Sequence, residues 1–425
     1  MSYYLRYEFF PVGQGLFAAG MLCSSSNNTQ KIRWVYDCGT SSKSPPNLIN
    51  NAIKSLEESL NCETVPNAPR PKLNLVAISH FDEDHISEMS TLLSQFDVEI
   101  LLLPYMPLSQ RLMLAFEEGI KVKDSMMQFF VNPVQYVNQI VKTKIEKIVL
   151  VPASSGSGPT KETGNNEGRR NEELLTIEKI DSRDPIKDDE KEDKEIFKDK
   201  VLFLKEHAAL RISGIWEFVP YNDVGLAREV SESFRKAVAR ERTALISNQN
   251  KKDVDEALIR LKDLYDQRFG SISRKRNMIS LFLYGGPINS KVFGPLYPFL
   301  CEYLVCCFQR SRWHHYETLL NTGRCSILYT GDGYLDIEKR IKAMQDYLGQ
   351  TRIDKLHTLQ VMHHGAKKNC GAGVAKRLNP VVSVFCADPS YKYKHPYESV
   401  LREFVSHRPI LVDKDYGITI NFCFE

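Results

Sequence analysis

The sequence predicts a layered α/β fold that is interrupted by helical insertions. Over the first 152 residues, apolar runs typical of strands alternate with patterns typical of helices, as in a sheet covered by helices. In several places, side chains that can bind a metal directly follow such a strand. A segment rich in charged and small residues, 153–200, interrupts the pattern.

The composition is that of a soluble globular protein. The chain has 425 residues, of which 42% are hydrophobic and 26% are charged. A formal net charge of +3 is too small to indicate that the surface as a whole is basic enough to bind nucleic acid or anionic membranes. The ten cysteines have irregular spacings, and the N-terminal residues lack the pattern of a signal peptide. We therefore expect a cytoplasmic protein with reduced thiols and no association with membranes.

Residues 1–152 are expected to form the N-terminal half of the fold. Alternating strand and helix patterns, separated by turn residues, define the elements of this half. The expected elements are two strands within 3–22, strands over 33–39, 73–79, 98–103 and 147–151, and helices over about 47–60, from 85 onward, over 108–116 and over 134–141.

Residues 153–200 are expected to form a mobile charged loop. They begin with serine and glycine and end in a run of charged residues, so they bury too little apolar surface to offset their ordering entropy. An acidic segment that binds a partner is the alternative interpretation. Residues 201–275 are expected to add a strand over 214–220 and a hairpin of two amphipathic helices, which packs on the body or docks a partner.

Residues 276–425 are expected to form the C-terminal half of the fold. An insertion over 287–321 separates its first two strands. Three cysteines in this insertion lack the spacing of a zinc knuckle and are interpreted as core packing; they are Cys301, Cys306 and Cys307. The expected strands are 277–283, 325–329, 359–362 and 381–386.

The densest group of metal-ligand residues follows the strand over 73–79. Its members are His80, Asp82, Asp84 and His85. Carboxylates and imidazoles bind divalent cations, and a bound cation lowers the pKa of a coordinated water toward neutrality. Asp84 and His85 are adjacent at the start of a helix, so they converge on one ion only if the backbone turns there. A helix cap with surface charges is the alternative interpretation.

Three further strand ends carry side chains of the same kind. They are Asp332, the pair His363 and His364, and His395, and the first three lie close to a glycine. One such carboxylate could be an ordinary turn residue, whereas four strand ends of this kind in one chain predict a metal site. The chain is therefore expected to be a metal-dependent hydrolase.

Together these motifs resemble the metallo-β-lactamase superfamily, and specifically the branch of the ComEC-type competence nuclease domains. The resemblance covers about residues 5–104 and 276–405 and leaves 105–275 and 287–321 without a counterpart. The motifs that carry it are His80-x-Asp82-x-Asp84-His85, Thr330-Gly331-Asp332, His363-His364-Gly365, His395-Pro396, Val12-Gly13-Gln14-Gly15, Asp37-Cys38-Gly39, and the pair Asn277 and Ser280.

The resemblance implies a specific architecture and a metal cofactor. The architecture is an αββα metallo-β-lactamase sandwich with helical insertions. The cofactor is one or two divalent ions, Mn²⁺ or Zn²⁺, at one edge of the two sheets. The implied ligands are His80 and Asp82 at one metal position, Asp84 and His85 at the other, and Asp332 as the bridge between them.

The pair His363 and His364 is implied to supply another imidazole. His363 is the preferred ligand because it lies nearer to the end of its strand, and His364 is the alternative. The sequence lacks a separate histidine for the third motif of the superfamily. His207 is the only histidine between His85 and His314 in the sequence. It is either a metal ligand or a residue outside the site. One metal position is then expected to be weak or empty.

Other matched residues are implied to act beside the metal. Asp37 would orient the cluster, and Asp84 would take part in catalysis as well as in binding the metal. His395 would bind phosphate or donate a proton. Asn277 and Ser280 would contact the substrate.

The resemblance and the carboxylate-rich ligand set favour a phosphodiesterase, most readily a nuclease, that acts through metal-activated water. Asp82 stands where many superfamily members have histidine, and this harder ligand favours manganese over zinc. The expected partner is a nucleic acid or another phosphodiester, with a protein partner docking on the helical insertions as a further expectation. The alternatives are hydrolysis of a small ester, lactone or nucleotide signal, and a triggered effector subunit in a multi-protein, defence-type assembly.

Overall fold

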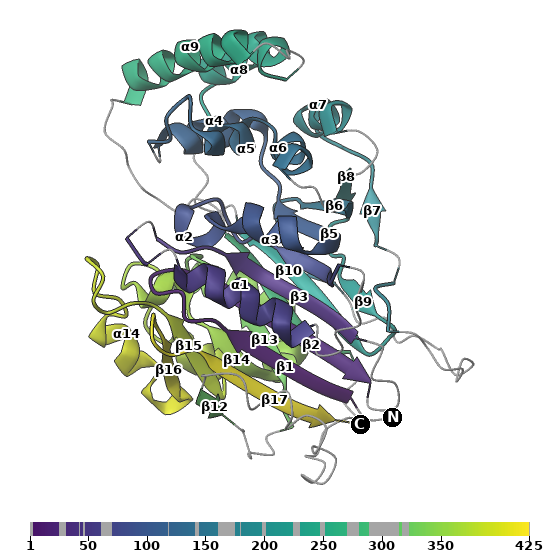
Figure 1. Ribbon diagram of the computed structural model, residues 1–425, viewed down its shortest axis with the longest axis vertical. Coiled ribbons are helices and arrows are strands. Elements are labelled where there is room, and N and C mark those ends of the chain that lie inside the picture. Colours follow the sequence, from purple (N-terminus) through teal and green to yellow (C-terminus); the bar gives the residue numbers. More distant parts are fainter. Residues whose placement is uncertain are drawn as a thin grey trace.

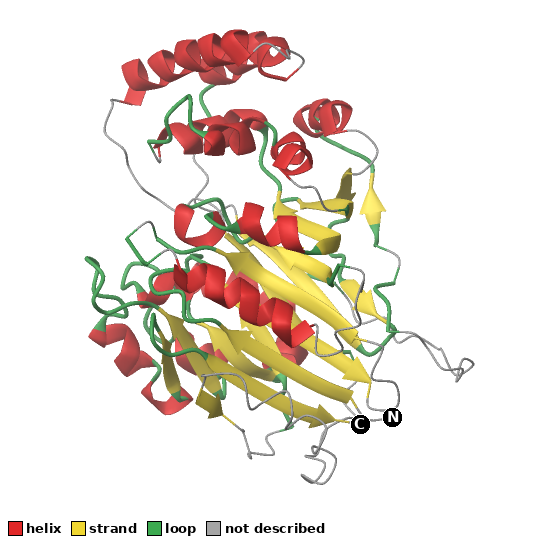
Figure 2. Cartoon of the chain, viewed as in Figure 1, coloured by secondary structure: helices red, strands yellow, loops and turns green. Residues whose placement is uncertain are grey.

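The chain folds into two β-sheets that pack face to face, with helices on both outer sides (Figures 1 and 2). The first and last strands pair, so the two ends of the chain lie close together. The computed structural model describes residues 3–24, 31–41, 43–45, 47–60, 70–117, 119–140, 144–159, 175–178, 180–197, 201–223, 230–246, 251–269, 280–288, 314–316 and 323–424.

The first sheet, sheet A, contains the N-terminal strands and the last strand of the chain. Its strands from β17 to β3 are antiparallel, whereas those from β3 to β8 are parallel, so that their carboxyl ends meet at one edge. The order is β12 (His314–Tyr316), β17 (Ile418–Phe424), β1 (Tyr3–Phe9), β2 (Phe17–Ser24), β3 (Lys31–Cys38), β4 (Lys72–Ala77), β5 (Asp97–Pro104), β6 (Ile145–Val151), β8 (Val201–Leu204) and β7 (Ser182–Arg183).

The second sheet, sheet B, contains most of the C-terminal strands. The strands from β13 to β16 are parallel, and the remaining pairs are antiparallel. The order is β16 (Pro409–Val412), β15 (Val382–Cys386), β14 (Leu356–Gln360), β13 (Ser326–Tyr329), β11 (Ser280–Pro287), β10 (Trp216–Asp223) and β9 (Leu210–Ile212).

Aromatic side chains fill the space between the two sheets. Trp34 of β3 contacts Phe218 of β10 with ring centroids 5.0 Å apart, and Tyr36 stacks on Tyr329 of β13 at 4.6 Å. The indole N–H of Trp34 donates a hydrogen bond to the Tyr329 hydroxyl at 3.2 Å, so the polar atoms of these buried rings are satisfied. This core fixes how the strand ends of one sheet face those of the other.

Helices cover the outer face of each sheet. Apolar residues of α1 (Asn47–Leu60) and α3 (Met89–Gln95) pack on sheet A. Those of α11 (Glu338–Leu348), α13 (Val374–Leu378) and α14 (Glu398–Glu403) pack on sheet B, where the short helix α12 (Gln350–Ile353) also lies. The αββα sandwich that the sequence predicts is therefore confirmed.

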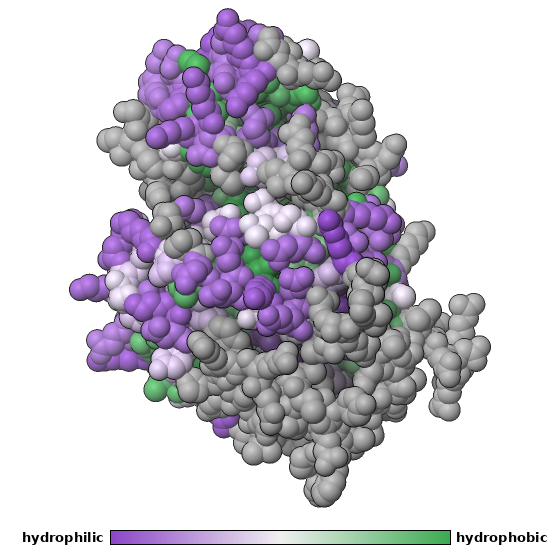
Figure 3. All heavy atoms as spheres, viewed as in Figure 1, coloured by the Kyte–Doolittle hydropathy of each residue, from purple (hydrophilic) through white to green (hydrophobic). Residues whose placement is uncertain are grey.

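An additional group of helices extends from the sheet A side of the sandwich, at the top of Figure 1. Phe116 of α4 contacts Phe234 of α8 and Tyr265 of α9, with ring centroids 6.5 and 5.7 Å apart. The visible surface of α8 and α9 is largely hydrophilic (Figure 3). The helices are α4 (Leu108–Glu117), α5 (Ser125–Val131), α6 (Pro133–Ile140), α8 (Glu232–Ile246) and α9 (Lys251–Phe269). Among the described residues, no helix combines the length and apolar character that crossing a bilayer requires.

The structure differs from the mobile loop expected over 153–200. Residues 182–183 form β7, and Asp188–Phe197 form the helix α7. Asp193 of this helix is buried and pairs with Arg111 of α4 at 3.2 Å, and Glu190 accepts two hydrogen bonds from Arg183. Acidic residues that looked solvated in the sequence are thus held by arginines, whose planar guanidinium suits buried ion pairs.

Other expectations concern residues that lie outside the described part of the chain. These are Asn277, the cysteines Cys301, Cys306 and Cys307, and the segments 160–174 and 289–313.

Replacing Arg111 with methionine is expected to lower the free energy of unfolding by about 3–5 kcal/mol, because Asp193 would keep its buried charge without its main partner. Denaturant unfolding measures this change. The control is Arg377→Met, which breaks a largely exposed pair with Glu338 and should cost less than about 1 kcal/mol. Adding Asp193→Leu to Arg111→Met should restore the part of the loss that comes from the unpaired carboxylate, but not the part that comes from the hydrogen bonds of Arg111 to the carbonyls of Met106, Phe130 and Val131. If Arg111→Met and Arg377→Met lowered the free energy of unfolding equally, the stabilising ion pair between α4 and α7 would be contradicted.

Candidate metal centre

The strand ends of both sheets meet at one edge of the sandwich, where the predicted motifs converge. From sheet A come Asp37 at the end of β3 and the loop after β4, which leads into α2 (Glu83–Ile86). From sheet B come Asp332 after β13 and the 3₁₀ turn Met362–Gly365 after β14. Ligand-type side chains that are far apart in sequence therefore share one site.

The carboxylate of Asp37 is fully buried and ties three segments together. Its Oδ1 accepts a hydrogen bond from the Ser79 backbone N–H at 2.7 Å, and its Oδ2 accepts one from the Ser79 hydroxyl at 2.6 Å. The Nδ1 of His85 lies 2.8 Å from the same Oδ2. Burial raises the pKa of Asp37, whereas His85 and Ser79 act to lower it. With Nδ1 engaged by Asp37, His85 directs its Nε2 toward Asp332 in the centre.

Two glycines allow the motif loops to approach one another. A Cβ on Gly39 would lie 2.3 Å from the backbone of His85, so a side chain there would displace α2. Gly331 has a φ of +52°, and a Cβ on it would lie 2.5 Å from Ser79. Gly39 is thus required by close packing between the end of β3 and α2, and Gly331 by close packing between the two sheets.

Asp332 lies at the middle of the group, and its two oxygens face different histidines. Oδ1 lies 2.9 Å from Nε2 of His85 and 3.6 Å from Nε2 of His364. Oδ2 lies 3.1 Å from Nδ1 of His363 and 3.7 Å from Nε2 of His80. The carboxylate of Asp332 therefore lies between two groups of histidines, one at each of its oxygens.

Each side of Asp332 also has its own aspartate. We define half-site 1 as the histidines that face Oδ2 of Asp332, His80 and His363, with Asp82 beside His80, and half-site 2 as those that face Oδ1, His85 and His364, with Asp84 beside His364. Asp82 Oδ2 lies 3.7 Å from His80 Nε2, and Asp84 Oδ2 lies 3.2 Å from His364 Nε2. Two overlapping groups bring their ligand atoms within 4.8 Å of one another: His80, His85 and Asp332, and Asp84, His85 and His364.

The sequence predicts one ligand from the pair His363 and His364, with His363 preferred, whereas both rings face the centre. Both residues have left-handed backbone conformations, with φ of 47° and 56°. Such conformations are costly for residues other than glycine and occur at functional sites. They turn two consecutive side chains toward different oxygens of Asp332. The buried His364 places its Nδ1 against the Cys386 carbonyl, which directs its Nε2 toward Asp84.

The buried histidine nitrogens fit a metal cation. Burial lowers the pKa of His80 to about 3, so its ring is neutral, which is the form that binds metals. Its Nδ1 is held by the Ser79 hydroxyl at 2.8 Å. Within the described residues, Nε2 of His80 is buried without a hydrogen-bond partner, whereas Nε2 of His85 lies 2.9 Å from Oδ1 of Asp332. A buried polar atom of this kind is costly unless something else satisfies it, and a cation would do so.

The carboxylates of Asp332 and Asp84 are held in the ionised form. Burial alone would raise the pKa of Asp332, but His363 and His85 outweigh it and hold that pKa well below its usual range. Burial also acts to raise the pKa of Asp84, but the hydrogen bond and the charge of His364 outweigh it and lower that pKa. In His85, burial acts to lower the pKa, but Asp332 and Asp37 raise it well above its ordinary value. Without a metal, a proton on His85 thus balances part of the negative charge that a cation would neutralise.

His395 lies beside the two central histidines rather than among the ligand groups. Its ring centroid is 5.8 Å from that of His363 and 6.4 Å from that of His364. Its Nδ1 is buried and has no hydrogen-bond partner in the part of the chain that the structure describes. Burial, with the charges of His364 and His363, lowers the pKa of His395 to about 4.

The inserted helices contact the first motif through Phe81. This ring lies between His80 and Asp82 in the sequence, is buried, and packs edge-on against Phe129 and Phe130 of α5 with centroids 4.9 and 5.7 Å apart. Sequence reasoning did not single out Phe81, because an apolar residue within a charged motif gives no sign of the surface that it contacts.

Gln360 is a second supporting residue that the sequence did not reveal. Its Oε1 accepts hydrogen bonds at 2.8 Å from the backbone N–H groups of both Thr330 and Gly331, which fixes the turn that carries Asp332. Ser280, a predicted substrate contact, is buried and donates to the Thr330 carbonyl at 2.9 Å, so it supports the same turn. A long polar side chain at the end of a buried strand was the available signal for Gln360.

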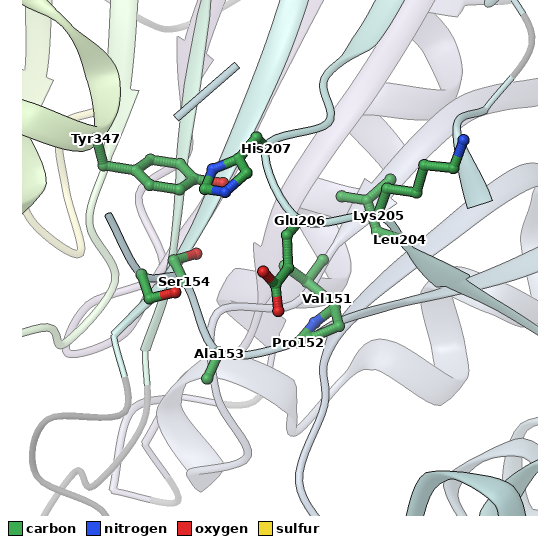
Figure 4. Close-up of a pocket in the computed structure, with 10 residues that line it drawn as sticks. Val151, Pro152, Ala153, Ser154, Leu204, Lys205, Glu206, His207 and Tyr347 are labelled. Carbon is green, nitrogen blue, oxygen red and sulfur yellow. The ribbon is translucent and has the colours of Figure 1, made fainter. Parts of the chain in front are cut away.

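His207 lies in a different place. It lines a small pocket with Tyr347, Ser154 and Glu206, and its ring centroid is 6.3 Å from that of Tyr347 (Figure 4). The pocket is formed by residues 151–155 and 204–207 with Tyr347, whereas the candidate ligands come from other segments.

Comparison with known proteins gives distant structural likenesses. No family model matches the sequence, and no curated protein matches it significantly. Among solved structures, the chain is similar to the metallo-β-lactamase fold protein YhfI from Bacillus subtilis, with 8% identity, a TM-score of 0.34, and coverage of 98% of this chain and 99% of that one. It is also similar to a long form of RNase Z from yeast, with 9% identity and a TM-score of 0.26, over 84% of this chain and 32% of that one. Because both TM-scores are low, the fold assignment depends on the sheets and helices of the chain itself.

His363→Ala is expected to lower the metal content of the protein, because half-site 1 loses an imidazole while half-site 2 keeps all its side chains. His364→Ala should do the same through half-site 2. Elemental analysis of the purified, metal-loaded protein measures the metal content. His207→Ala is the control, since that ring lies in the other pocket. Wild-type metal content in His363→Ala, or a loss in His207→Ala, would contradict the assignment.

Proposed function

We propose that the chain is a metal-dependent hydrolase of the metallo-β-lactamase superfamily, that it cleaves phosphodiesters, and that it is most closely related in function to the ComEC-type nucleases. The observation that carries the proposal is the position of Asp332, whose two oxygens face half-sites of two histidines and one aspartate each. A carboxylate between two such half-sites is suited to hold a pair of divalent ions.

A pair of divalent ions, when bound, would activate water at neutral pH and neutralise charge on a phosphate group. The chain supplies the rest. Asp84 is ionised and lies at the open side of half-site 2, where its carboxylate can orient the attacking water. Asp37 and the Cys386 carbonyl hold His85 and His364 in position, so little reorganisation accompanies the reaction.

His395 is proposed to act on the leaving group. Its Nδ1 is buried and its ring lies next to that of His363, which puts a titratable group beside the reacting phosphate. An anionic substrate favours the protonated form of a neighbouring imidazole, so binding would raise the pKa of His395 from about 4. His395 could then donate a proton to the leaving oxygen or bind the phosphate directly.

The centre is accessible from one side. His80, His85 and His364 have side chains that are almost fully buried, whereas those of Asp82, Asp84 and His363 are 20, 24 and 27% exposed. A substrate would therefore approach along these three residues. Such an approach is open to a strand of nucleic acid and also to a small ester, lactone or nucleotide. A cleavage screen with substrates of each class distinguishes between them.

One observation favours a second candidate function, a triggered effector in a multi-protein assembly. Phe81, in the middle of the first motif, packs on Phe129 and Phe130 of the inserted helix α5. A protein partner that shifted these helices would move His80 and Asp82 with them. A purified chain that binds metal and cleaves nothing until a partner is added would support this candidate.

Asp84→Ala and Asp332→Ala are each expected to lower the rate of phosphodiester hydrolysis by about three orders of magnitude or more, since a metal site contributes several kcal/mol to the transition state. The measurement is a cleavage screen with single- and double-stranded DNA and RNA, cyclic nucleotides, and ester and lactone substrates. Asp354→Ala, which removes an exposed carboxylate of the described chain, is the control and should behave like the wild type. Wild-type turnover in Asp84→Ala or Asp332→Ala would remove the metal assignment, and cleavage of esters alone would overturn phosphodiester chemistry.

Metal-stripped protein is expected to regain hydrolysis with manganese better than with zinc, because Asp82 gives half-site 1 a hard oxygen ligand. Asp82→His should narrow or reverse this preference, whereas the surface substitution Asp354→His should not. Initial rates across a titration of each metal measure the effect. If zinc alone restored full activity to the wild type, the explanation by ligand hardness would be wrong for this site.

A further inference from the structure

Exposed tyrosines and lysines surround the entrance to the candidate metal centre. Tyr393 and Tyr397 are 46% and 44% exposed. Lys392 and Lys394 alternate with the tyrosines and are exposed as well. We call the segment 391–397 the tyrosine rim.

The rim is connected to the centre by a series of rings. Tyr393 stacks beside His395 with centroids 5.9 Å apart and planes at 25°, and His395 in turn stacks beside His364 at 6.4 Å and 17°. Tyr397 lies on another side of His395 at 5.3 Å. The exposed ring of Tyr393 thus lies directly beside His395, the proposed proton donor, and His395 lies beside His364 of half-site 2.

Hydrogen bonds hold the rim in one conformation. The N–H of Lys394 donates to the Tyr391 carbonyl at 2.8 Å, so Lys392 and Tyr393 are the central residues of a tight turn. Ser41 donates to the Tyr391 hydroxyl at 2.8 Å, and the Tyr397 N–H donates to the Gly365 carbonyl at 3.1 Å. These contacts anchor the rim to sheet A and to the turn after His364, so Tyr393 is presented without a large ordering cost.

The charge of this entrance suits an anion. The ammonium group of Lys392 lies 4.4 Å from the centre of the Tyr393 ring, and Lys367 and Lys368 are exposed shortly after His364. Glu398 next to the rim is paired with Arg402, which offsets its charge. Positive side chains interleaved with flat rings are the arrangement by which proteins bind single strands, the lysines contacting phosphates and the rings stacking on bases.

We propose that the tyrosine rim binds a single-stranded nucleic acid, with a base stacked on Tyr393 and the backbone running past Lys392 toward His395 and Asp332. This inference rests on the proposed function, because it names the substrate class of that site. A single strand is favoured over a duplex because the bases of a duplex already stack on one another and leave no face for the ring. The rim therefore selects unpaired strands with little preference for sequence.

The test measures binding of fluorescent single strands of DNA and RNA to the full-length, metal-loaded chain by anisotropy. The strands carry phosphorothioate linkages, which keep the charge but resist cleavage. Tyr393→Ala should weaken binding by about 5- to 100-fold, whereas Tyr393→Phe should keep the wild-type affinity. Lys392→Ala should lower the slope of log affinity against log salt by about 0.7.

Two controls match these substitutions. Ile337 is 48% exposed at the start of α11, and Ile337→Ala removes an apolar side chain of similar exposure to Tyr393. Lys342→Ala removes an exposed charge from the same helix. Both should leave affinity and salt dependence unchanged. A loss of binding in either control equal to that of the rim variants would overturn the proposal.

Two further probes separate stacking from charge. A strand of equal length without bases should bind at least about tenfold more weakly than the complete strand, and so should a duplex. Equal affinity for the strand without bases, tighter binding of the duplex, or unchanged binding by Tyr393→Ala would overturn the inference. An unmodified single strand is then incubated with the wild type. Binding through Tyr393 without cleavage would leave the rim assignment standing and contradict the proposed hydrolysis.

Discussion

The buried carboxylate of Asp37 is the constraint on which the candidate centre depends. A charge at this depth is costly unless it is surrounded by donors, and Asp37 receives them from both the backbone and the side chain of Ser79 and from His85. Because these donors belong to different segments, satisfying one carboxylate fixes the end of β3, the loop after β4 and the start of α2 at the same time. The orientation of His85, and through it the place of Asp332, follows from that requirement.

The second requirement is that the two sheets meet closely at the same edge. Asp332 comes from sheet B, yet its nearest neighbour, His85, comes from sheet A at 2.9 Å. Gly331 permits this approach because a Cβ there would collide with Ser79. The stacked rings of Tyr36 and Tyr329 and the hydrogen bond from the Ser280 hydroxyl to the Thr330 carbonyl hold the sheets at that separation. The centre is therefore a product of packing between the sheets and not of either sheet alone.

Much of this centre could be predicted from sequence because its signals are local. A ligand-type side chain shortly after an apolar run indicates a strand end, and His80, Asp332 and His363 each satisfy that pattern. What could not be predicted depends on contacts between distant segments. The left-handed conformations of the two consecutive histidines let both rings face Asp332, which no spacing rule indicates. Likewise, the charged run around Asp193 looked solvated because its partner, Arg111, lies 82 residues away.

The two half-sites are supported in different ways, and this difference has a consequence for control. Half-site 2 is fixed by the hydrogen bond that His85 donates to Asp37 and by the one that His364 donates to the Cys386 carbonyl, which demand one geometry. Half-site 1 also has a hydrogen bond, between the Ser79 hydroxyl and His80, but its loop additionally depends on apolar packing of Phe81 on α5, whose last carbonyls are held by Arg111. Apolar contacts restrict direction less than hydrogen bonds do. Any rearrangement of the inserted helices would therefore reach His80 and Asp82 before it disturbed His85 and His364, so the insertion is placed to adjust one half-site while the other stays fixed.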